Sequence, residues 1–468
     1  MIKFFNTMDR KLEEFKSIHP NEVRMYTCGP TVYNFAHIGN FRAYMFEDLL
    51  RRTLKYFGYK VTQVMNLTDV DDKTIRDSQA ANMSLDDFTA QYKKSFFEDL
   101  KTLNIEAAEV YPAATDHISE MITLIEVLIE KGYAYQADDN CVYFSIAKFP
   151  EYGKLAKIDL ENQRPGERVK NDEYAKDSVA DFALWKAWDE HDGDVHWESP
   201  WGKGRPGWHI ECSAMAMRYL GKTFDIHTGG IDNMFPHHED EIAQSEAANG
   251  CTYVNYWLHC AHLMVEGDKM SKSAGNFYTL RECIDKGYDG RELRWVLLGA
   301  HYRKKLNFTF AACDQARAIL TKINGFFIHL KGINLEGDGS EAQEIVSKAK
   351  HAFDKGLAND LNISEALSAV HGLLRNGYQL FNDRTLSKAG AEMILEQFRK
   401  FDEVFALFNV DAEKADDVPA EVMEMAEKRC TARAEKDWAT ADVMRDQLKK
   451  LGWVVEDSTE GFRVKRID

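Results

Sequence analysis

Residues 22–40 read EVRMYTCGPTVYNFAHIGN, and this stretch passes from an apolar strand pattern through a turn into a helix start. The apolar residues before Thr27 predict a buried strand, and the Cys-Gly-Pro that follows ends it. A helical pattern then continues to Gly58, and residues 59–67 predict a second strand. Strand, helix and strand within about 45 residues are the repeating unit of a parallel α/β sheet.

The length and composition indicate a large globular protein. The chain has 468 residues, enough for about two to four domains. Hydrophobic residues make up 44% and charged residues 29%, which excludes collagen-like and wholly disordered chains. The formal net charge of −17 argues against a nucleic acid partner, unless positive side chains gather locally.

The chain lacks the patterns of membrane and secreted proteins. No run approaches the ~18 uncharged apolar residues of a membrane-spanning helix. Residues 1–15 contain charges of both signs, unlike a signal peptide, so we expect a cytoplasmic location and no membrane partner. The eight cysteines include no Cys-x-x-Cys pair, and we expect reduced thiols rather than a disulfide framework.

The remaining patterns predict an insertion in the α/β domain and then a largely helical region. Helical periodicity, a hairpin and a polar stretch interrupt the α/β pattern, which returns before a strand ending in glycines and a helix from Pro236. We therefore expect five parts: an α/β domain (1–115 and 200–256), an insertion (116–199), a region with a lysine-rich loop (257–310), a helical bundle (311–408) and a small mixed α/β domain (420–468).

The turn before the first helix contains His37, Gly39 and Asn40. Free backbone N–H groups and the positive end of the helix dipole favour phosphate at such a position. Gly39 has no Cβ, so a flat ring such as adenine can approach the backbone, and His37 can stabilise a triphosphate in the transition state. A single histidine at a helix start is more often a cap, so this motif alone predicts little.

The lysine-rich loop reads KMSKS at 269–273 and is followed by Gly275. Two lysines on a mobile loop can hold a pyrophosphate leaving group, although a solvated basic loop is the ordinary alternative. With the first motif and in this order, the loop resembles the signature sequences of class I aminoacyl-tRNA synthetases. That resemblance implies a Rossmann-like catalytic domain.

A helix that begins near Pro236 contains candidate metal ligands. His237 and Glu241 lie four residues apart and share one helix face, whereas His238 and Ile242 share another, and periodicity does not choose between them.

Two cysteines are further candidates. Cys28 follows the first strand, and Cys212 lies in GWHIECS at 207–213. Two thiolates, an imidazole and a carboxylate would form a tetrahedral zinc site. Each of these residues taken alone is more often structural, and only the fold can bring the two cysteines together.

Five stretches are those expected of cysteinyl-tRNA synthetases, which the chain resembles along nearly its whole length: TCGPTVY (27–33), NLTDVDDK (66–73), SPWG (199–202), GRPGWHIEC (204–212) and FPHHE (235–239). The resemblance implies one zinc ion per chain and magnesium bound with ATP. It assigns the zinc ligands to Cys28, Cys212, His237 and Glu241.

The same resemblance assigns the substrate sites. Cysteine would be bound by Gly29, Thr31, Thr68, Trp208 and His227. ATP would be bound by His37, Gly39, Asn40, Asp232 and Lys272, although Asn40 stands where the family often has a second histidine. The catalytic residues would be His37, Lys269 and Lys272. The anticodon of tRNA-Cys would be contacted by Arg433, Trp438, Asp442 and Asp457.

The expected reaction has two steps: L-cysteine and ATP form cysteinyl-adenylate, and the 3′ end of tRNA-Cys then takes the cysteinyl group. Selection by size between cysteine and serine is worth only ~1–3 kcal/mol. Zinc binds a thiolate much better than a hydroxyl, so we expect the metal to provide specificity rather than Lewis-acid catalysis.

A tRNA partner requires local positive charge despite the net charge of −17. A cluster at 291–305 contains Arg294, and residues 428–468 contain more basic than acidic residues. Trp438 and Trp453 offer rings on which bases can stack, but for Trp453 a place in the core is the stronger interpretation.

Two alternatives belong to other classes. A related ligase that joins cysteine to an amino sugar would share the zinc and nucleotide motifs but not residues 344–468, and a zinc-dependent RNA-binding protein without enzymatic activity would not need His37 or Lys272. The presence of all these features favours the synthetase, which we expect to act as a monomer.

Overall fold

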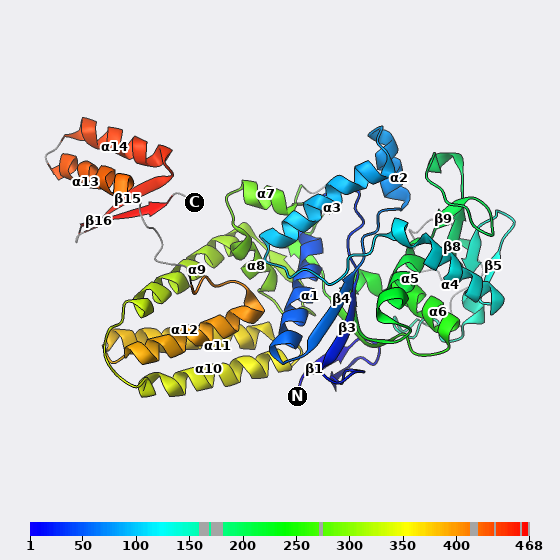
Figure 1. The fold of residues 1–468 in the computed structure, drawn as a ribbon, viewed down its shortest axis with the longest axis horizontal. Helices are drawn as coiled ribbons and strands as arrows, with labels where there is room; N and C mark the ends of the chain where they lie inside the picture. Colours follow the sequence, from blue (N-terminus) through cyan, green and yellow to red (C-terminus); the bar gives the residue numbers. More distant parts are fainter. Residues whose placement is uncertain are drawn as a thin grey trace. The chain divides into compact units, whose positions relative to one another are not determined.

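The computed structural model describes residues 1–158, 168–169, 181–270, 275–411, 420–434, 437–458 and 461–466. The chain divides into two units (Figure 1). Unit 1 comprises Met1–Phe326 and Leu330–Phe408, and unit 2 comprises Phe327–His329 and Asn409–Asp468.

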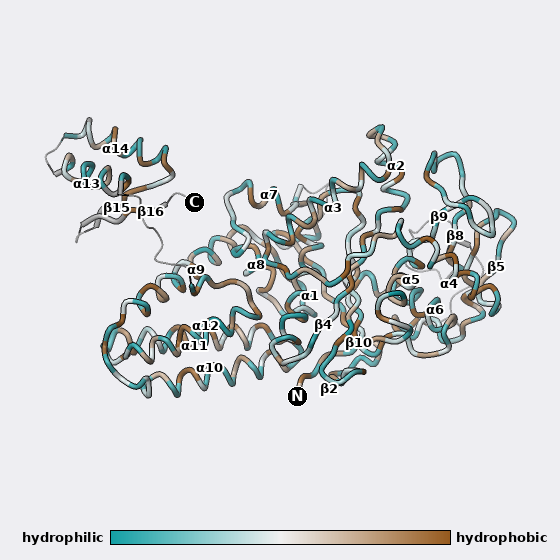
Figure 2. Tube along the Cα trace, in the orientation of Figure 1, coloured by the Kyte–Doolittle hydropathy of each residue, from teal (hydrophilic) through white to brown (hydrophobic). Residues whose placement is uncertain are grey.

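Unit 1 is built on a parallel sheet with the order β11-β10-β3-β4. Its strands are β3 (Glu22–Thr27), β4 (Lys60–Met65), β10 (Phe224–Gly230) and β11 (Val254–Cys260). The strands are largely buried, as expected when helices cover both faces of a parallel sheet, and Figure 2 shows hydrophobic segments along them. The sequence pattern predicted β3, β4 and the helix between them correctly.

Helices cover this sheet. Helix α1 (Ile38–Tyr56) connects β3 to β4 on one side, and α5 (Trp208–Leu220) with α6 (His237–Asn249) lies on the other (Figure 1). Two further helices follow β4, α2 (Asp72–Ala80) and α3 (Leu85–Thr102). A hairpin of β1 (Lys3–Asn6) and β2 (Lys11–Glu14) precedes the sheet.

A second sheet with the strand path β5-β6-β8-β7 lies within the predicted insertion, and β9 pairs with β8. Its elements are β5 (Ala134–Gln136), β6 (Val142–Phe144), β7 (Arg168–Val169), β8 (Asp181–Ala187), β9 (Gly204–Pro206) and the neighbouring helix α4 (Ile118–Glu130). Side chains of this sheet and of α4 share one hydrophobic core with Tyr26 and Val64 of the parallel sheet. The insertion therefore packs as part of the α/β domain.

The region after β11 has short elements: β12 (Leu263–Val265), β13 (Asp268–Lys269), β14 (Leu306–Phe308), α7 (Leu280–Asp285) and α8 (Gly290–Leu298). Four long helices follow: α9 (Phe310–Lys331), α10 (Ser340–Ala358), α11 (Ile363–Asn382) and α12 (Lys388–Phe405). Rings such as Phe353, Phe398 and Phe401 pack among these helices, which confirms the predicted helical region.

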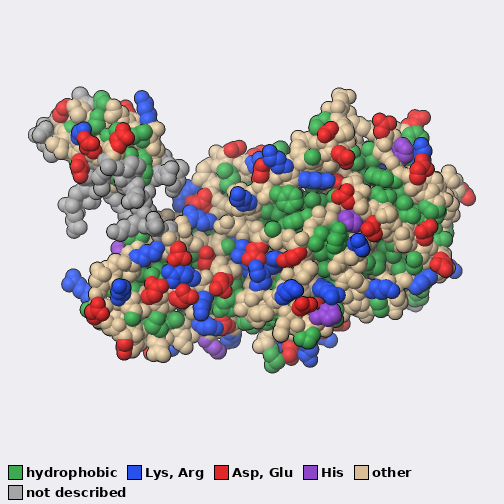
Figure 3. All heavy atoms as spheres, in the orientation of Figure 1, with side chains coloured by type: hydrophobic (Ala, Val, Ile, Leu, Met, Phe, Trp, Pro, Cys, Tyr) green, Lys and Arg blue, Asp and Glu red, His purple; other side chains and the backbone are tan. Residues whose placement is uncertain are grey.

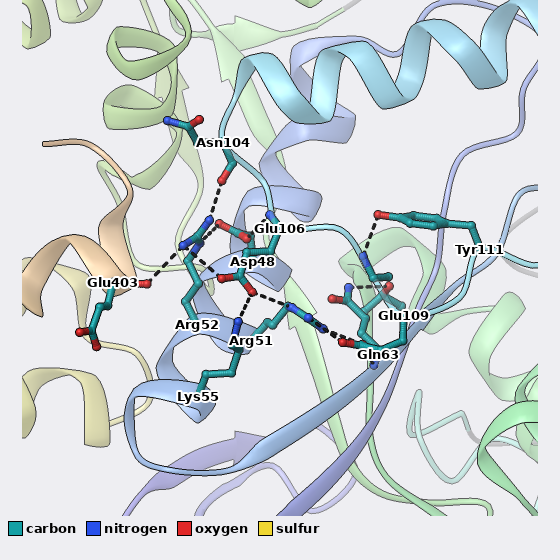
Figure 4. Close-up of polar contacts among 12 residues, drawn as sticks. Asp48, Arg51, Arg52, Lys55, Gln63, Asn104, Glu106, Glu109, Tyr111 and Glu403 are labelled. Carbon is teal, nitrogen blue, oxygen red and sulfur yellow. Dashed lines mark hydrogen bonds and ion pairs between the residues drawn. The ribbon is translucent and has the colours of Figure 1, made fainter. Parts of the chain in front are cut away.

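Buried charges join the end of α12 to α1. Asp48 of α1 accepts hydrogen bonds from Arg52 Nε at 2.8 Å and from Arg294 Nη2 at 2.5 Å. Arg294 Nε also donates to the Phe405 carbonyl at 2.5 Å. Arg52 Nη1 donates to the Glu403 carbonyl at 3.2 Å (Figure 4). Arg294 is fully buried, so the prediction that it belongs to an exposed tRNA-binding cluster is wrong.

Unit 2 contains the predicted helix pair and β hairpin: α13 (Ala420–Ala434), α14 (Trp438–Lys450), β15 (Trp453–Ser458) and β16 (Gly461–Arg466). Its small core consists of Val422, Ala426, Leu448, Trp453 and Val464. Trp453 is therefore a core residue, as the sequence favoured.

On the face drawn in Figure 3, basic and acidic side chains are interspersed. Among the described residues, no helix is long and apolar enough to cross a membrane.

Candidate active site at the carboxyl ends of the parallel strands

A cavity of about 1070 Å³ opens where β3 and β10 end. From these adjacent strands the chain runs in opposite directions across the sheet, from β3 to β4 and from β10 to β11. Parallel α/β sheets bind ligands at the point where two such connections diverge. Most of the predicted site residues line it: Cys28, Gly29, Thr31, His37, Gly39, Asn40, Trp208, Cys212, Asp232, His237 and Lys269. Residues far apart in the sequence thus meet in one cavity.

His37 and Asn40 cap the start of α1. His37 Nδ1 accepts a hydrogen bond from the Asn40 N–H, and Asn40 Oδ1 accepts one from the His37 N–H, both at 3.1 Å. The capping role considered for His37 is therefore present, and its ring also faces the cavity beside Phe277. A Cβ on Gly39 would lie 2.9 Å from His37 Nδ1, so a side chain there would displace the imidazole.

Described residues of both signature motifs meet at this cavity. Lys269 lines it, and the Ile38 N–H donates to the Tyr278 carbonyl at 3.0 Å. A β-bridge between His37 and Thr279 adds a second connection to the segment after the loop. Lys272 lies outside the described residues, so its predicted role stays a prediction.

The candidate metal ligands converge beside the cavity. One ligand atom from each of Cys28, Cys212, His237 and Glu241 lies within 4.8 Å of the others. Cys28 follows β3, Cys212 lies on α5, and the other two lie on α6. The parallel sheet and its two covering helices therefore bring together cysteines that spacing could not connect.

Periodicity did not choose between the two faces of α6, and the face that carries His238 also contributes to this cluster. His238 Nε2 lies 3.3 Å from Cys28 Sγ, and Cys28, His227, His238 and Glu241 form a second group with ligand atoms within 4.8 Å. Both histidines of α6 thus approach the shared residues Cys28 and Glu241.

The electrostatics of the cluster fit a bound cation. Burial raises the pKa of the Cys212 thiol well above its usual value, so a dry thiolate there requires positive charge. Burial would also raise the pKa of Glu241, but His227 and His237 outweigh burial and hold that pKa at about 2. Glu241 Oε1 lies 3.1 Å from His237 Nε2, so two of the candidate ligands already face each other. Two thiols, an imidazole and a carboxylate are the ligand types of zinc.

A chain of hydrogen bonds shapes the predicted cysteine pocket. The Gly29 N–H donates to Asn66 Oδ1 at 2.9 Å, Asn66 Nδ2 donates to Thr68 Oγ1 at 3.1 Å, and Thr68 donates to Glu211 at 2.8 Å. The Trp208 ring stacks on His237 at 4.3 Å between ring centroids. The wall of this part of the cavity is therefore fixed by backbone and buried polar groups.

Two predicted pocket residues lie behind the wall instead of lining it. Thr68 is 1% exposed and His227 is 0% exposed. His227 Nε2 lies 2.9 Å from Glu241 Oε2, and its ring stacks on Trp257. In this structure both residues hold other members of the site.

The cavity includes residues that no sequence motif singled out as site residues. Phe35, Asn66, Lys73 and Arg76 line it, as does Phe277. Asn66 and Lys73 fall within the quoted NLTDVDDK stretch, whose polar residues after a strand were the available signal.

In unit 2 the three predicted anticodon residues with described side chains, Arg433, Trp438 and Asp442, are all exposed. Trp438 begins α14 and exposes 59% of its surface, which fits base stacking better than a core role. Asp442 pairs with Arg445 at 2.7 Å, and Arg433 lies near the end of α13. The side chain of Asp457, on β15, lies outside the described part of the chain.

The fold matches solved class I synthetases. Methionyl-tRNA synthetase from Mycobacterium tuberculosis aligns with a TM-score of 0.62 and 13% identity over 82% of this chain and 92% of that chain. A putative arginyl-tRNA synthetase from Campylobacter jejuni aligns at 0.57, with 13% identity over 86% and 95%. With the sheet and the two motifs, these alignments define a class I aminoacyl-tRNA synthetase fold, as predicted.

Sequence comparisons specify the family. Residues 14–318 match the class I (C) tRNA synthetase catalytic domain, and residues 415–463 match the cysteinyl-tRNA ligase anticodon binding domain. The chain is 50% identical to cysteine–tRNA ligase of Protochlamydia amoebophila over 99% of this chain and 98% of that protein. It is 49% identical to that of Brachyspira hyodysenteriae over 99% of each. The chain belongs to the cysteinyl-tRNA synthetase family and is an aminoacyl-tRNA ligase.

Proposed function

We propose that this protein activates L-cysteine with ATP and transfers the cysteinyl group to the 3′ end of tRNA-Cys, with one zinc ion selecting the thiol over the hydroxyl of serine. The convergence of Cys28, Cys212, His237 and Glu241 within 4.8 Å, beside the cavity that holds both signature motifs, is the observation that supports this most directly.

The chain's own residues bind and orient ATP. The start of α1 offers N–H groups to the phosphates, the bare backbone at Gly39 admits adenine, and Asp232 at the cavity wall accepts from the ribose. His37, Lys269 and Lys272 stabilise the leaving pyrophosphate together with magnesium. The cysteine carboxylate attacks the α-phosphate in line as pyrophosphate leaves, and no protein nucleophile is needed.

The zinc ligands provide discrimination between amino acids. Zinc held by this donor set would bind the thiolate of cysteine far better than the hydroxyl of serine. Gly29 and Trp208 flank the cluster at the cavity and orient the substrate, while Thr68 and His227 hold the wall behind. Trp438 and its neighbours contact the anticodon, and the protein acts as a cytoplasmic monomer.

The test is charging of total tRNA by the purified protein with ATP, magnesium and labelled cysteine, with serine in a parallel reaction. We expect charging with cysteine alone. Pyrophosphate exchange without charging would favour the amino-sugar ligase, and neither activity in zinc-loaded protein would favour an RNA-binding protein.

The variant Cys212→Ser tests the role of zinc. We expect a rise of about 100-fold or more in the KM for cysteine with an unchanged KM for ATP, because one thiolate ligand is lost. The exposed thiol of Cys251 provides the control, since Cys251→Ser should change neither value. Full zinc content with normal cysteine affinity in Cys212→Ser would contradict the proposal.

A further inference from the structure

An aromatic and basic platform lies at the mouth of the cavity, and we define it as Phe35, Tyr92 and Arg281. Phe35 lines the cavity two residues before His37 and exposes 40% of its surface. Other rings of the chain, such as Phe97 and Trp188, are equally exposed, but Phe35 lies in the lining of the candidate active site, where a ligand can cover it.

The structure holds this ring from two directions. The Tyr92 ring of α3 meets it edge to face, with 5.4 Å between centroids. The Arg281 guanidinium of α7 lies 5.2 Å from its centroid. Arg281 is itself fixed, because its Nη2 donates to Glu98 at 2.9 Å and to the Ser95 carbonyl at 3.3 Å. The platform is therefore ordered before any ligand arrives.

The chemistry of the platform fits a nucleobase joined to phosphates. An ordered aromatic ring offers a stacking surface to any base, and an adjacent guanidinium attracts the neighbouring phosphate. Lys73 and Arg76 line the same cavity, and the Lys73 ammonium lies 5.8 Å from the centroid of Tyr33. Asp71 and Asp72 line the cavity beside these two cations, so the exposed ring, and not an excess of positive charge, carries the inference.

We propose that Phe35, supported by Tyr92 and Arg281, stacks an unpaired nucleotide of the tRNA as its 3′ end enters the cavity. This inference rests on the proposed function. The terminal ribose must reach the adenylate inside the cavity, so the nucleotides before it must cross the mouth as single strand. Single-stranded RNA is bound by stacking of unpaired bases on exposed rings.

The variant Phe35→Ala separates the two steps of the reaction. Pyrophosphate exchange, which needs no tRNA, should stay within about twofold of the wild type. The kcat/KM for tRNA charging should fall about tenfold, as expected for one lost stacking contact. Phe35→Tyr keeps an aromatic ring and should charge tRNA as well as the wild type does. Trp188 is equally exposed (41%) but lies outside the cavity lining, so Trp188→Ala should leave both steps unchanged.

A binding measurement locates the contact on the tRNA. Phe35→Ala should weaken the binding of full-length tRNA but not of tRNA trimmed of its unpaired 3′ nucleotides. Equal weakening for both would overturn the proposal. A raised KM for ATP in pyrophosphate exchange would also overturn it, because the ring would then belong to the ATP site.

A second variant guards against a folding defect. Arg281→Gln should show the same division between intact exchange and weakened charging. Proportional loss of both activities in both variants would overturn the proposal and indicate a structural role. If the wild type charges tRNA and both variants charge it equally well, only this inference fails, whereas a wild type that charges no tRNA refutes the proposed function itself.

Discussion

Gly29 has no room for a side chain. An added Cβ would lie 1.7 Å from the Asn66 carbonyl oxygen, and a backbone atom cannot move aside as a flexible side chain can. We therefore expect Gly29→Ala to abolish cysteine activation and to destabilise the protein by about 1–3 kcal/mol, measured by pyrophosphate exchange and thermal unfolding. Gly372→Ala is the control, because its Cβ would meet nothing within 4 Å on α11, and it should unfold at the same or a higher temperature.

Asp99 makes stability depend on pH. Burial raises its pKa from 3.8 to about 6, and the nearby Arg281 offsets only part of this effect. A pKa raised on folding gives stability that is complete below about pH 4 and is lost as pH rises through 6. Asp99→Asn keeps the shape but removes the charge, so its advantage over the wild type should grow between about pH 4 and pH 6.5 to about 1–2 kcal/mol and then level off.

Thermal unfolding at several pH values measures this advantage. Glu98 on the same helix gives an opposite control, because its hydrogen bond from Arg281 lowers its pKa. Glu98→Gln should therefore give no such gain at neutral pH. A gain in Asp99→Asn that does not vary with pH would contradict the assignment.

At the scale of elements, Asp48 and its two arginine partners hold the end of α12 to α1. Asp48 lies on α1, whose start is capped by His37, and it is the acidic partner of the fully buried Arg294. Asp48→Asn leaves that guanidinium charge buried without a counter-ion, so we expect a loss of roughly 3–5 kcal/mol in the free energy of unfolding.

Denaturant unfolding and limited proteolysis measure this effect. Release of α12 from α1 should expose the α12 end to protease before the rest of unit 1. The exposed pair of Glu344 and Lys348 on α10 provides the control, and Glu344→Gln should change neither measurement. Equal stability of Asp48→Asn and the wild type would show that the buried Arg294 guanidinium does not depend on the charge of Asp48.

At the scale of the whole molecule, the sequence predicted what depends on local pattern. Residues 22–40 predicted the α/β unit because apolar spacing, turn residues and helix starts are encoded within a few positions. Arg294 was mistaken for a surface charge, because its buried partners Asp48 and the Phe405 carbonyl lie far away in the chain.

The site shows the same difference between what local sequence pattern predicts and what depends on residues far apart in the chain. The HIGN and KMSKS motifs could be located from sequence, whereas the approach of Cys28 to Cys212 depends on the pairing of β10 with β3 and the packing of α5 on the sheet. The platform at Phe35 was missed because exposure cannot be inferred from an apolar residue in a turn.

The two units predict a division of labour that one pair of tryptophans can test. Trp438 exposes 59% of its surface, whereas Trp453 is in the core of unit 2. Trp438→Ala should lower kcat/KM for tRNA charging about tenfold by removing a stacking surface, with normal pyrophosphate exchange and normal unfolding. Trp453→Ala should also spare exchange, since unit 1 has its own core, but it should unfold unit 2 and make it sensitive to protease. Loss of exchange in either variant would show that activation in unit 1 depends on unit 2.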